Sequence, residues 1–336
     1  MTSIKILMLI LIILLVSIAV YMTVENVTPT TPTTEMSRAT TTTSVSSRPV
    51  TREYSLCNST IISKAVSYIN EIRSGYGLPP VKYVNTSIAT YKVKSMMSLA
   101  YFGHCNLNGT PYLYDYTRIG GHYFPEENLG VTYVYQGRLT EDPLNLTLDH
   151  IWAMVYNDSS SSWGHRDSLL DPTNNYIDLA CAYNDKRYFL AIYLVKIWVN
   201  WIDPPVYDNQ TGIFHASGYI ILENSSLVQV GIYSIEKENV ISWPRRAGIA
   251  FTCSSLSLGD LYAVVTPHRV TGVKTIIPET YIVDDNYFDV TFHISVEKDR
   301  YLVIVFWINN TLPVAHPFDP ERYGGGIPVL AYTLGP

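Results

Sequence analysis

The chain has 336 residues, a formal net charge of -6 and 15% charged residues, below the roughly 25% of an average globular chain. Its length suffices for two ordinary domains, and the lack of a long basic run argues against nucleic-acid binding. Ser, Thr, Asn and Tyr supply much of the polar surface, a composition typical of proteins that face the outside of a cell.

Residues 6–24 form an apolar run without a charged residue. At ~1.5 Å per residue it nearly spans a ~30 Å hydrocarbon layer. Lys5 precedes the run and Glu25 follows it, so we expect a signal-anchor transmembrane helix over residues 1–25. The anchor predicts a single-pass cell-membrane protein whose folded domains lie outside the cytoplasm. A signal peptide cleaved near Ala19 is the alternative.

Residues 26–54 are rich in Thr, Ser and Pro, and contain too little apolar surface to fold. This composition predicts an extended, O-glycosylated stalk. Sequons for N-glycosylation also occur along the chain and predict a glycoprotein in a cell that has the machinery: Asn26, Asn58, Asn85, Asn108, Asn145, Asn157, Asn209, Asn224 and Asn309.

Helical periodicity dominates the next part of the chain. Apolar residues at helical spacing predict helices over residues 59–73, 88–101 and 147–156, the last with Trp152 turned inward. Residues 106–121 predict a turn-rich loop, and residues 166–170 a short helix.

From residue 176 onward the periodicity is that of β-strands. Residues 176–183 and 188–199 predict a hairpin, and Asp203-Pro204-Pro205 marks a domain boundary. Short apolar runs between turn residues then predict an all-β, sandwich-like domain over residues 204–336. Its clearest hairpin is predicted from residues 288–296 and 301–308.

The four cysteines suit an oxidising compartment. Cys57, Cys105, Cys181 and Cys253 allow three pairings, between which the sequence does not choose, and buried free thiols are the alternative.

Three residues stand out as a candidate site: His104, Glu127 and His165. Two imidazoles and a carboxylate are ligand types for a divalent metal such as zinc, and also the parts of a general acid/base pair. No His-Glu-x-x-His motif occurs. A serine hydrolase using the serines before His165 is an alternative that lacks a nucleophile elbow. His122 is a candidate extra ligand, and Glu126 is expected to face solvent.

Several short motifs in residues 55–201 follow one another in the order of a known family. They are Asn70-Glu71-Ile72-Arg73, Gly77-Leu78-Pro79-Pro80, Phe102-Gly103-His104-Cys105-Asn106, Gly120-Gly121-His122, Glu127-Asn128-Leu129, Trp152, and Gly164-His165-Arg166 followed by Leu169-Leu170-Asp171-Pro172. This unit resembles the CAP superfamily (SCP domain) of cysteine-rich secretory, antigen-five and pathogenesis-related proteins, and is most similar to its prokaryotic branch.

The resemblance implies an α-β-α sandwich with a cleft that holds two His and two Glu. His104, Glu127 and His165 carry over by motif position. The second Glu is expected at position 155, where this chain has valine. Asp158 is a candidate replacement. Members of the family have been linked to lipid, metal and cell-wall binding, and in some cases to proteolysis.

We therefore expect an α+β protein, with a CAP domain over residues 55–203 and the β domain over residues 204–336. The predicted function is a membrane-anchored module that binds a small-molecule, lipid, glycan or peptide ligand, with a divalent-metal site in its cleft. Enzymatic activity is left open, with binding preferred. A metal-dependent surface hydrolase of the peptidase type and a structural or adhesive surface protein are the alternatives.

Overall fold

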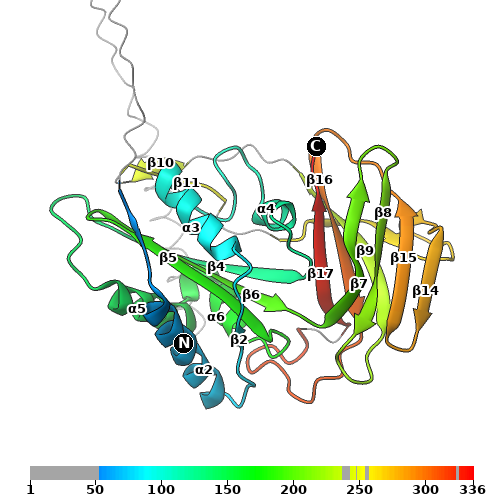
Figure 1. Cartoon of the computed structure of the whole chain (residues 1–336), viewed down its shortest axis with the longest axis horizontal. Coiled ribbons are helices and arrows are strands. Elements are labelled where there is room, and N and C mark those ends of the chain that lie inside the picture. Colours follow the sequence, from blue (N-terminus) through cyan, green and yellow to red (C-terminus); the bar gives the residue numbers. More distant parts are fainter. Residues whose placement is uncertain (1–52, 237–242, 247, 254–256, 323–324) are drawn as a thin grey trace, which may run out of the picture. The chain divides into compact units, whose positions relative to one another are not determined.

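The computed structural model describes residues 53–236, 243–246, 248–253, 257–322 and 325–336, which belong to one compact unit, residues 51–336. The predicted membrane anchor and nearly all of the predicted stalk lie outside the described residues. Within those residues no helix has the length and apolar character needed to cross a membrane. Helices and sheets are mixed, so the chain has an α+β fold (Figure 1).

A mostly antiparallel sheet forms the first part of the fold. Its strand order is β1-β5-β6-β4, with β2 beside β5. The central strand β6 is buried along its whole length, whereas β4 lies at an edge. The predicted hairpin is confirmed as β5 and β6, with Tyr183 opposite Tyr188. The strands are β1 (Ser55–Leu56), β2 (Lys82–Tyr83), β4 (Phe124–Tyr133), β5 (Tyr176–Tyr183) and β6 (Arg187–Lys196).

Helices cover both faces of this sheet (Figure 1). The helices α3 and α4 share a core with one face, and α2, α5 and α6 share a core with the other. The predicted helices are present, but α4 replaces part of the predicted loop, and Trp152 is exposed rather than inward. The helices are α2 (Ser59–Gly75), α3 (Ile88–Leu99), α4 (Tyr112–Arg118), α5 (Pro143–Tyr156), the 3₁₀ turn η1 (Ser159–Ser161) and α6 (Gly164–Leu169).

Local interactions explain where the longer helices begin. Asn58, rather than a residue inside the helix, caps α2 by accepting the backbone N–H of Ile61 at 3.0 Å. Asp142 caps α5 in the same way, and Pro143 follows at the first helical position, where no N–H is needed. This cap starts α5 one turn before the predicted residue 147.

Two further sheets face each other across a second core, which contains Phe214, Phe288 and Ile304. One sheet has the order β14-β15-β8-β7 and the other β13-β12-β9-β16-β17. Their strands are β7 (Val199–Asp208), β8 (Ile213–Ile220), β9 (Leu227–Glu236), β12 (Asp260–Val265), β13 (Thr275–Ile276), β14 (Thr280–Asp284), β15 (Tyr287–His293), β16 (Arg300–Ile308) and β17 (Ile327–Leu334).

The hairpin predicted from residues 288–296 and 301–308 is wrong. Strand β15 pairs with β14 and β8, whereas β16 pairs with β9 and β17 in the opposite sheet. Phe288 of β15 and Phe306 of β16 instead meet across the core, with ring centroids 5.6 Å apart. Alternating apolar residues indicate which face of a strand is buried, but do not identify the strand beside it.

Strand β7 runs through the predicted domain boundary at Asp203-Pro204-Pro205. Its pairing with β8 is irregular between Asp203 and Val206. The strand lies at the edge of its sheet, where a proline without an N–H is tolerated. The division into domains at this point stays a prediction.

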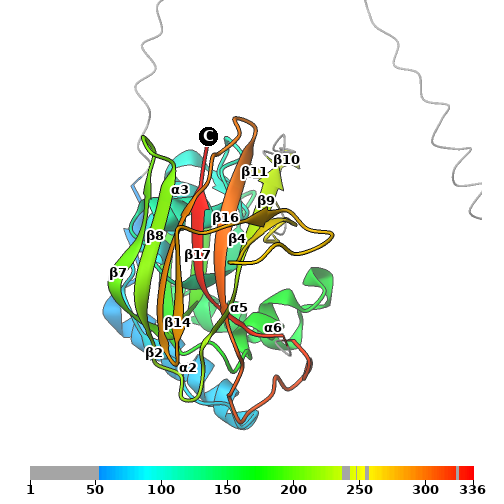
Figure 2. The ribbon, with the colours of Figure 1, turned by 90° about the vertical axis from the view of Figure 1, so that its right-hand side faces the viewer.

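The first sheet and the β-rich part of the chain are joined by several contacts. Strand β11 (Ile249–Phe251) pairs with β10 (Trp243–Arg246) and, in parallel, with β3 (Tyr101–Phe102). A disulfide between Cys105 and Cys253, with Cα atoms 5.3 Å apart, also crosses between the two parts. The second disulfide, Cys57–Cys181, with Cα atoms 5.2 Å apart, lies within the first part. Strands β16 and β17 also contribute to the core around α3 and α4, and Figure 2 shows them beside β4.

Candidate functional site

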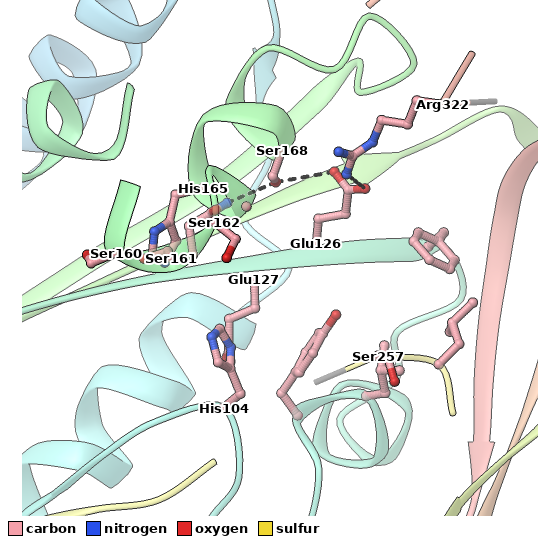
Figure 3. A pocket seen from close by; sticks show the side chains of 16 residues that line it. His104, Glu126, Glu127, Ser160, Ser161, Ser162, His165, Ser168, Ser257 and Arg322 are labelled. Carbon is pink, nitrogen blue, oxygen red and sulfur yellow. Dashed lines mark hydrogen bonds and ion pairs between the residues drawn. The ribbon is translucent and has the colours of Figure 1, made fainter. Parts of the chain in front are cut away.

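A cavity of about 640 Å³ lies along the edge strand β4 (Figure 3). Its walls come from β4, the start of α4, the η1–α6 segment and two segments of the β-rich part. The lining residues are His104, Tyr112, Leu113, Phe124, Glu126, Glu127, Asn128, Ser160, Ser161, Ser162, Gly164, His165, Ser168, Ser257, Leu258 and Arg322. All three residues predicted for the site, His104, Glu127 and His165, therefore line one cavity.

Strand β4 presents two adjacent carboxylates to opposite sides. Successive side chains of a strand alternate between its faces, so Glu126 and Glu127 diverge. Glu127 points toward His104, whereas Glu126 points toward Arg322 (Figure 3). Within the described residues, no strand pairs with the outer edge of β4, and both carboxylates line the cavity there.

His104 follows β3 in a segment that packs tightly against the β-rich part. Its backbone N–H donates to the carbonyl of Cys253 at 2.9 Å. Gly103, with φ of 145°, lies so close that a Cβ atom there would be 2.2 Å from Thr252 Oγ1. The imidazole Nδ1 lies 2.8 Å from Glu127 Oε1, so this pair fixes the ring orientation.

Glu127 is completely buried at its side chain and contacts three partners. Besides His104, its carboxylate accepts the hydroxyl of Tyr193 and lies 3.5 Å from the ammonium of Lys92. Burial, together with the negative charge of Glu127, raises the pKa of Tyr193, which stays a hydrogen-bond donor. These contacts fix the carboxylate in the position from which it orients the His104 ring.

His165 at the start of α6 has its own carboxylate partner. Asp158 Oδ1 lies 2.7 Å from His165 Nδ1, and Oδ2 accepts the backbone N–H groups of His165 and Arg166. Val155, at the position where the resemblance expects Glu, is buried in the core between helices and does not line the cavity. Asp158 supplies a carboxylate from the turn after α5 instead.

The two imidazoles therefore have equivalent settings. Each engages a carboxylate through Nδ1, and the exposed fractions of the His104 and His165 side chains are 14% and 22%. Metal-binding histidines usually have such a partner behind the ring, with the other nitrogen facing the ligand. In both residues the nitrogen left for a ligand is Nε2.

This arrangement fits a metal ligated by the two Nε2 atoms better than one ligated by Glu127, whose oxygens are engaged by His104, Tyr193 and Lys92. Among the described residues, no group of three or more His, Cys, Asp or Glu side chains is placed to hold a metal ion. The three-ligand site of His104, Glu127 and His165 stays a prediction.

The other candidates from the sequence have different surroundings. Contrary to expectation, Glu126 is largely buried and ion-paired, with Lys196 at 3.2 Å and Arg322 at 3.5 Å. His122 does not line the cavity, and burial lowers its pKa. Ser160 and Ser162 line the cavity, but no serine hydroxyl in the described part of the chain hydrogen-bonds to either imidazole.

Sequence reasoning missed the residues that the β-rich part contributes. Ser257 and Leu258 follow β11, and Arg322 lies in the connection between β16 and β17. The same connection places His316, whose Nε2 lies 2.9 Å from the carbonyl of Asp167, beside α6. No local pattern marks these residues, because only long-range contacts bring them to the cavity.

Comparisons with known proteins identify no family. No protein-family profile matches the chain, and no curated protein matches it. One similar solved structure is that of an outer surface protein from Borrelia burgdorferi, with 15% sequence identity and a TM-score of 0.34. The similarity covers 43% of this chain and 98% of that protein.

Proposed function

We propose that this chain is a membrane-anchored, extracytoplasmic CAP-domain protein whose cleft binds a ligand. The family assignment rests on the ordered motifs in residues 55–201, and helices on both faces of the first sheet are compatible with it. The observation that carries the binding function is the pair of carboxylate-oriented histidines, His104 and His165, in one cavity. The anchor and the cell-membrane location rest on the sequence of residues 1–54.

The cavity wall suggests the chemistry of the ligand. Serine hydroxyls and two imidazoles offer hydrogen bonds, whereas Tyr112, Leu113 and Phe124 offer apolar and aromatic surface. Sites that bind small molecules usually combine an apolar lining with a few placed polar groups. A glycan, a peptide segment or a lipid headgroup with part of its chain would satisfy both kinds of surface.

A divalent metal such as zinc is part of this proposal. Nε2 of His104 and Nε2 of His165 would hold it, with Glu127 and Asp158 as the outer partners of the two rings. When bound, the metal would supply a Lewis acid that polarises a ligand oxygen. The protein's own contribution is to fix the two rings and to keep Nδ1 of each engaged.

Calorimetry of the purified full chain in detergent tests the metal part. We expect Zn²⁺ binding by the wild type, loss of binding in His104→Gln and in His165→Gln, and retention in His268→Gln, which changes an exposed histidine elsewhere. A wild type that does not bind Zn²⁺, or binding that survives in both cavity variants, would remove the metal from the proposal.

A panel of cell-wall glycan fragments, unstructured peptides and lipid vesicles tests the ligand part. Ser257→Trp places a large side chain at the exposed edge of the cavity without changing a buried residue. We expect one class of ligand to bind the wild type and to lose at least tenfold in affinity in this variant. Equal affinities would show that binding occurs outside the cavity.

A metal-dependent hydrolase is the second candidate, and the Asp158–His165 pair favours it. A carboxylate that orients an imidazole facing a cavity is the base-and-orienter part of many hydrolytic sites. Peptide hydrolysis that is sensitive to a chelator and abolished by His165→Ala would support this candidate. Activity that persists in both His104→Ala and His165→Ala would exclude these residues as its source.

A further inference from the structure

A buried lysine, an asparagine and a glutamate contact one another beside the cavity, which the glutamate, Glu126, helps to line. Lys196, the last residue of β6, has a completely buried side chain. Its Nζ lies 2.8 Å from Asn174 Oδ1 and 3.2 Å from Glu126 Oε1. The contact between Asn174 Nδ2 and Glu126 Oε2, at 2.7 Å, completes the triangle.

The orientation of the Asn174 amide is fixed by a second contact. Its Nδ2 also donates to the backbone carbonyl of Ser168 at 3.0 Å, which only an N–H group can do. The carbonyl side of the amide therefore faces the lysine, and the nitrogen faces the glutamate. Since a C=O bond is about 1.2 Å long, the amide carbon lies within about 4 Å of Lys196 Nζ.

We propose that Lys196 and Asn174 are the site of an intramolecular isopeptide bond formed with the help of Glu126. The bond that forms joins Lys196 Nζ to Asn174 Cγ, and the bond that breaks joins Asn174 Cγ to Nδ2. Ammonia leaves, so no oxidant or other co-reactant is needed. This inference is independent of the function proposed for the cavity.

Glu126 is placed to move the protons. Oε1 contacts the lysine nitrogen and Oε2 contacts the amide nitrogen. It takes a proton from the ammonium, which gives the nucleophilic amine, and delivers a proton to the departing nitrogen. Burial of the two reacting residues, Lys196 and Asn174, keeps water from competing with the amine for the amide carbon.

Asp171 contacts the same lysine but is suited to a different role. Its Oδ2 lies 2.9 Å from Lys196 Nζ, while Oδ1 accepts the backbone N–H and the hydroxyl of Thr173. Burial alone would raise the pKa of this carboxyl, but Lys196 and the Thr173 hydrogen bonds lower it below its usual value. Asp171 therefore stays a carboxylate that positions Lys196, and Glu126 remains as the proton carrier.

The bond would close the open end of the β5–β6 hairpin. Asn174 lies just before β5, whereas Lys196 ends β6, and Tyr176 pairs with Val195 between them. The turn after Tyr183 closes the other end of the same hairpin. A covalent link at this position holds the buried central strand in register without depending on the redox state.

Peptide mapping of the reduced, trypsin-digested full chain tests the proposal. Trypsin does not cleave after an acylated lysine, so we expect no cleavage after Lys196. We also expect a branched peptide in which the segment starting at Tyr188 is joined to residues 167–186, with a mass lower by one ammonia than the sum of its parts. Glu126→Gln, which keeps both reacting residues, and Asn174→Ala should restore cleavage after Lys196.

Two outcomes would overturn the proposal. Normal cleavage after Lys196 in the wild type, with both peptides at their full masses, would mean that the cluster is only an ion-pair and hydrogen-bond network. A branched peptide that has lost water instead of ammonia, linked at Asp171, would reject Asn174 as the acceptor. Both readouts come from the wild type, so they do not depend on the folding of a variant.

Discussion

Asp158 lies directly behind His165, with 2.7 Å between Asp158 Oδ1 and His165 Nδ1. Its second oxygen accepts two backbone N–H groups at the start of α6, at 2.9 and 3.2 Å. One carboxylate therefore orients a ring in the cavity and also satisfies donors of the helix that carries this ring. Loss of this carboxylate would therefore affect both the stability of helix α6 and the orientation of the His165 ring.

Asp158→Asn is expected to weaken both the orientation of the His165 ring and the capping of α6. An amide can accept through only one oxygen, so either the ring or the backbone donors lose a partner. We expect a loss of about 1–2 kcal/mol in the free energy of unfolding. If Zn²⁺ binds in the cavity, its affinity should fall about 10–100-fold. Denaturant titration and calorimetry measure the two effects.

Asp149→Asn is the matched control, because Asp149 is an exposed residue of α5. This variant should unfold and bind as the wild type does. Wild-type binding and stability in Asp158→Asn would show that the carboxylate has neither role.

The Lys92–Glu127 pair gives a second prediction, since both side chains are buried and their charged atoms are 3.5 Å apart. Lys92→Met leaves a buried carboxylate without its cation and should cost about 3–5 kcal/mol of stability. Combining it with Glu127→Gln removes both charges and should recover a large part of that loss. Unfolding of the two single variants and the double variant in denaturant gives the interaction free energy. Strictly additive losses would contradict direct pairing.

The sequence predicted those parts of the fold and site that depend on local patterns. Apolar periodicity located α2, α3 and the β5–β6 hairpin. The order of the motifs predicted that His104, Glu127 and His165 share one cleft, and the three residues do line one cavity. Asp158 was identified only as a candidate, because a turn residue has no periodic signal.

The parts that the sequence did not predict depend on contacts between distant segments. Arg322 and Leu258 reach the cavity only because the β-rich part packs on the first sheet. The same reason explains the mispaired strands, since alternation in β15 and β16 is equally compatible with neighbours in one sheet and with opposite sheets.

The two disulfides should differ in their effect on the cavity. Each closes a loop of more than 100 residues, so removing either pair should cost about 2–5 kcal/mol. Cys105–Cys253 also holds the segment that carries Ser257 next to His104, whereas Cys57–Cys181 joins the start of the fold to β5. We expect Cys105→Ser/Cys253→Ser to bind the cavity ligand or Zn²⁺ at least tenfold more weakly.

The matched variant Cys57→Ser/Cys181→Ser should lose stability to a similar extent and keep its affinity. Calorimetry at a temperature where both variants are folded compares them. Equal affinities in the two double variants would mean that the position of the Ser257 segment does not matter for binding.

His150 predicts a specific pH dependence of stability. Its ring stacks on Tyr188 at 5.6 Å and contacts Thr132, and burial lowers the pKa of this histidine. The folded state therefore holds fewer protons on His150 than the unfolded state between the lowered pKa and about 6.5. Stability from this group is fully present above about pH 6.5 and is lost as the pH falls through that window. Burial also lowers the pKa of His122, so this histidine changes the stability with pH in the same direction.

Denaturant midpoints between about pH 7.5 and about pH 5.5 measure this effect. The wild type should lose stability toward the acid end, and His150→Gln should show a flatter profile because the contribution of His150 is gone. The profile of His268→Gln, which changes an exposed side chain, should match that of the wild type. An unchanged slope in His150→Gln would mean that His150 is not a source of the acid sensitivity.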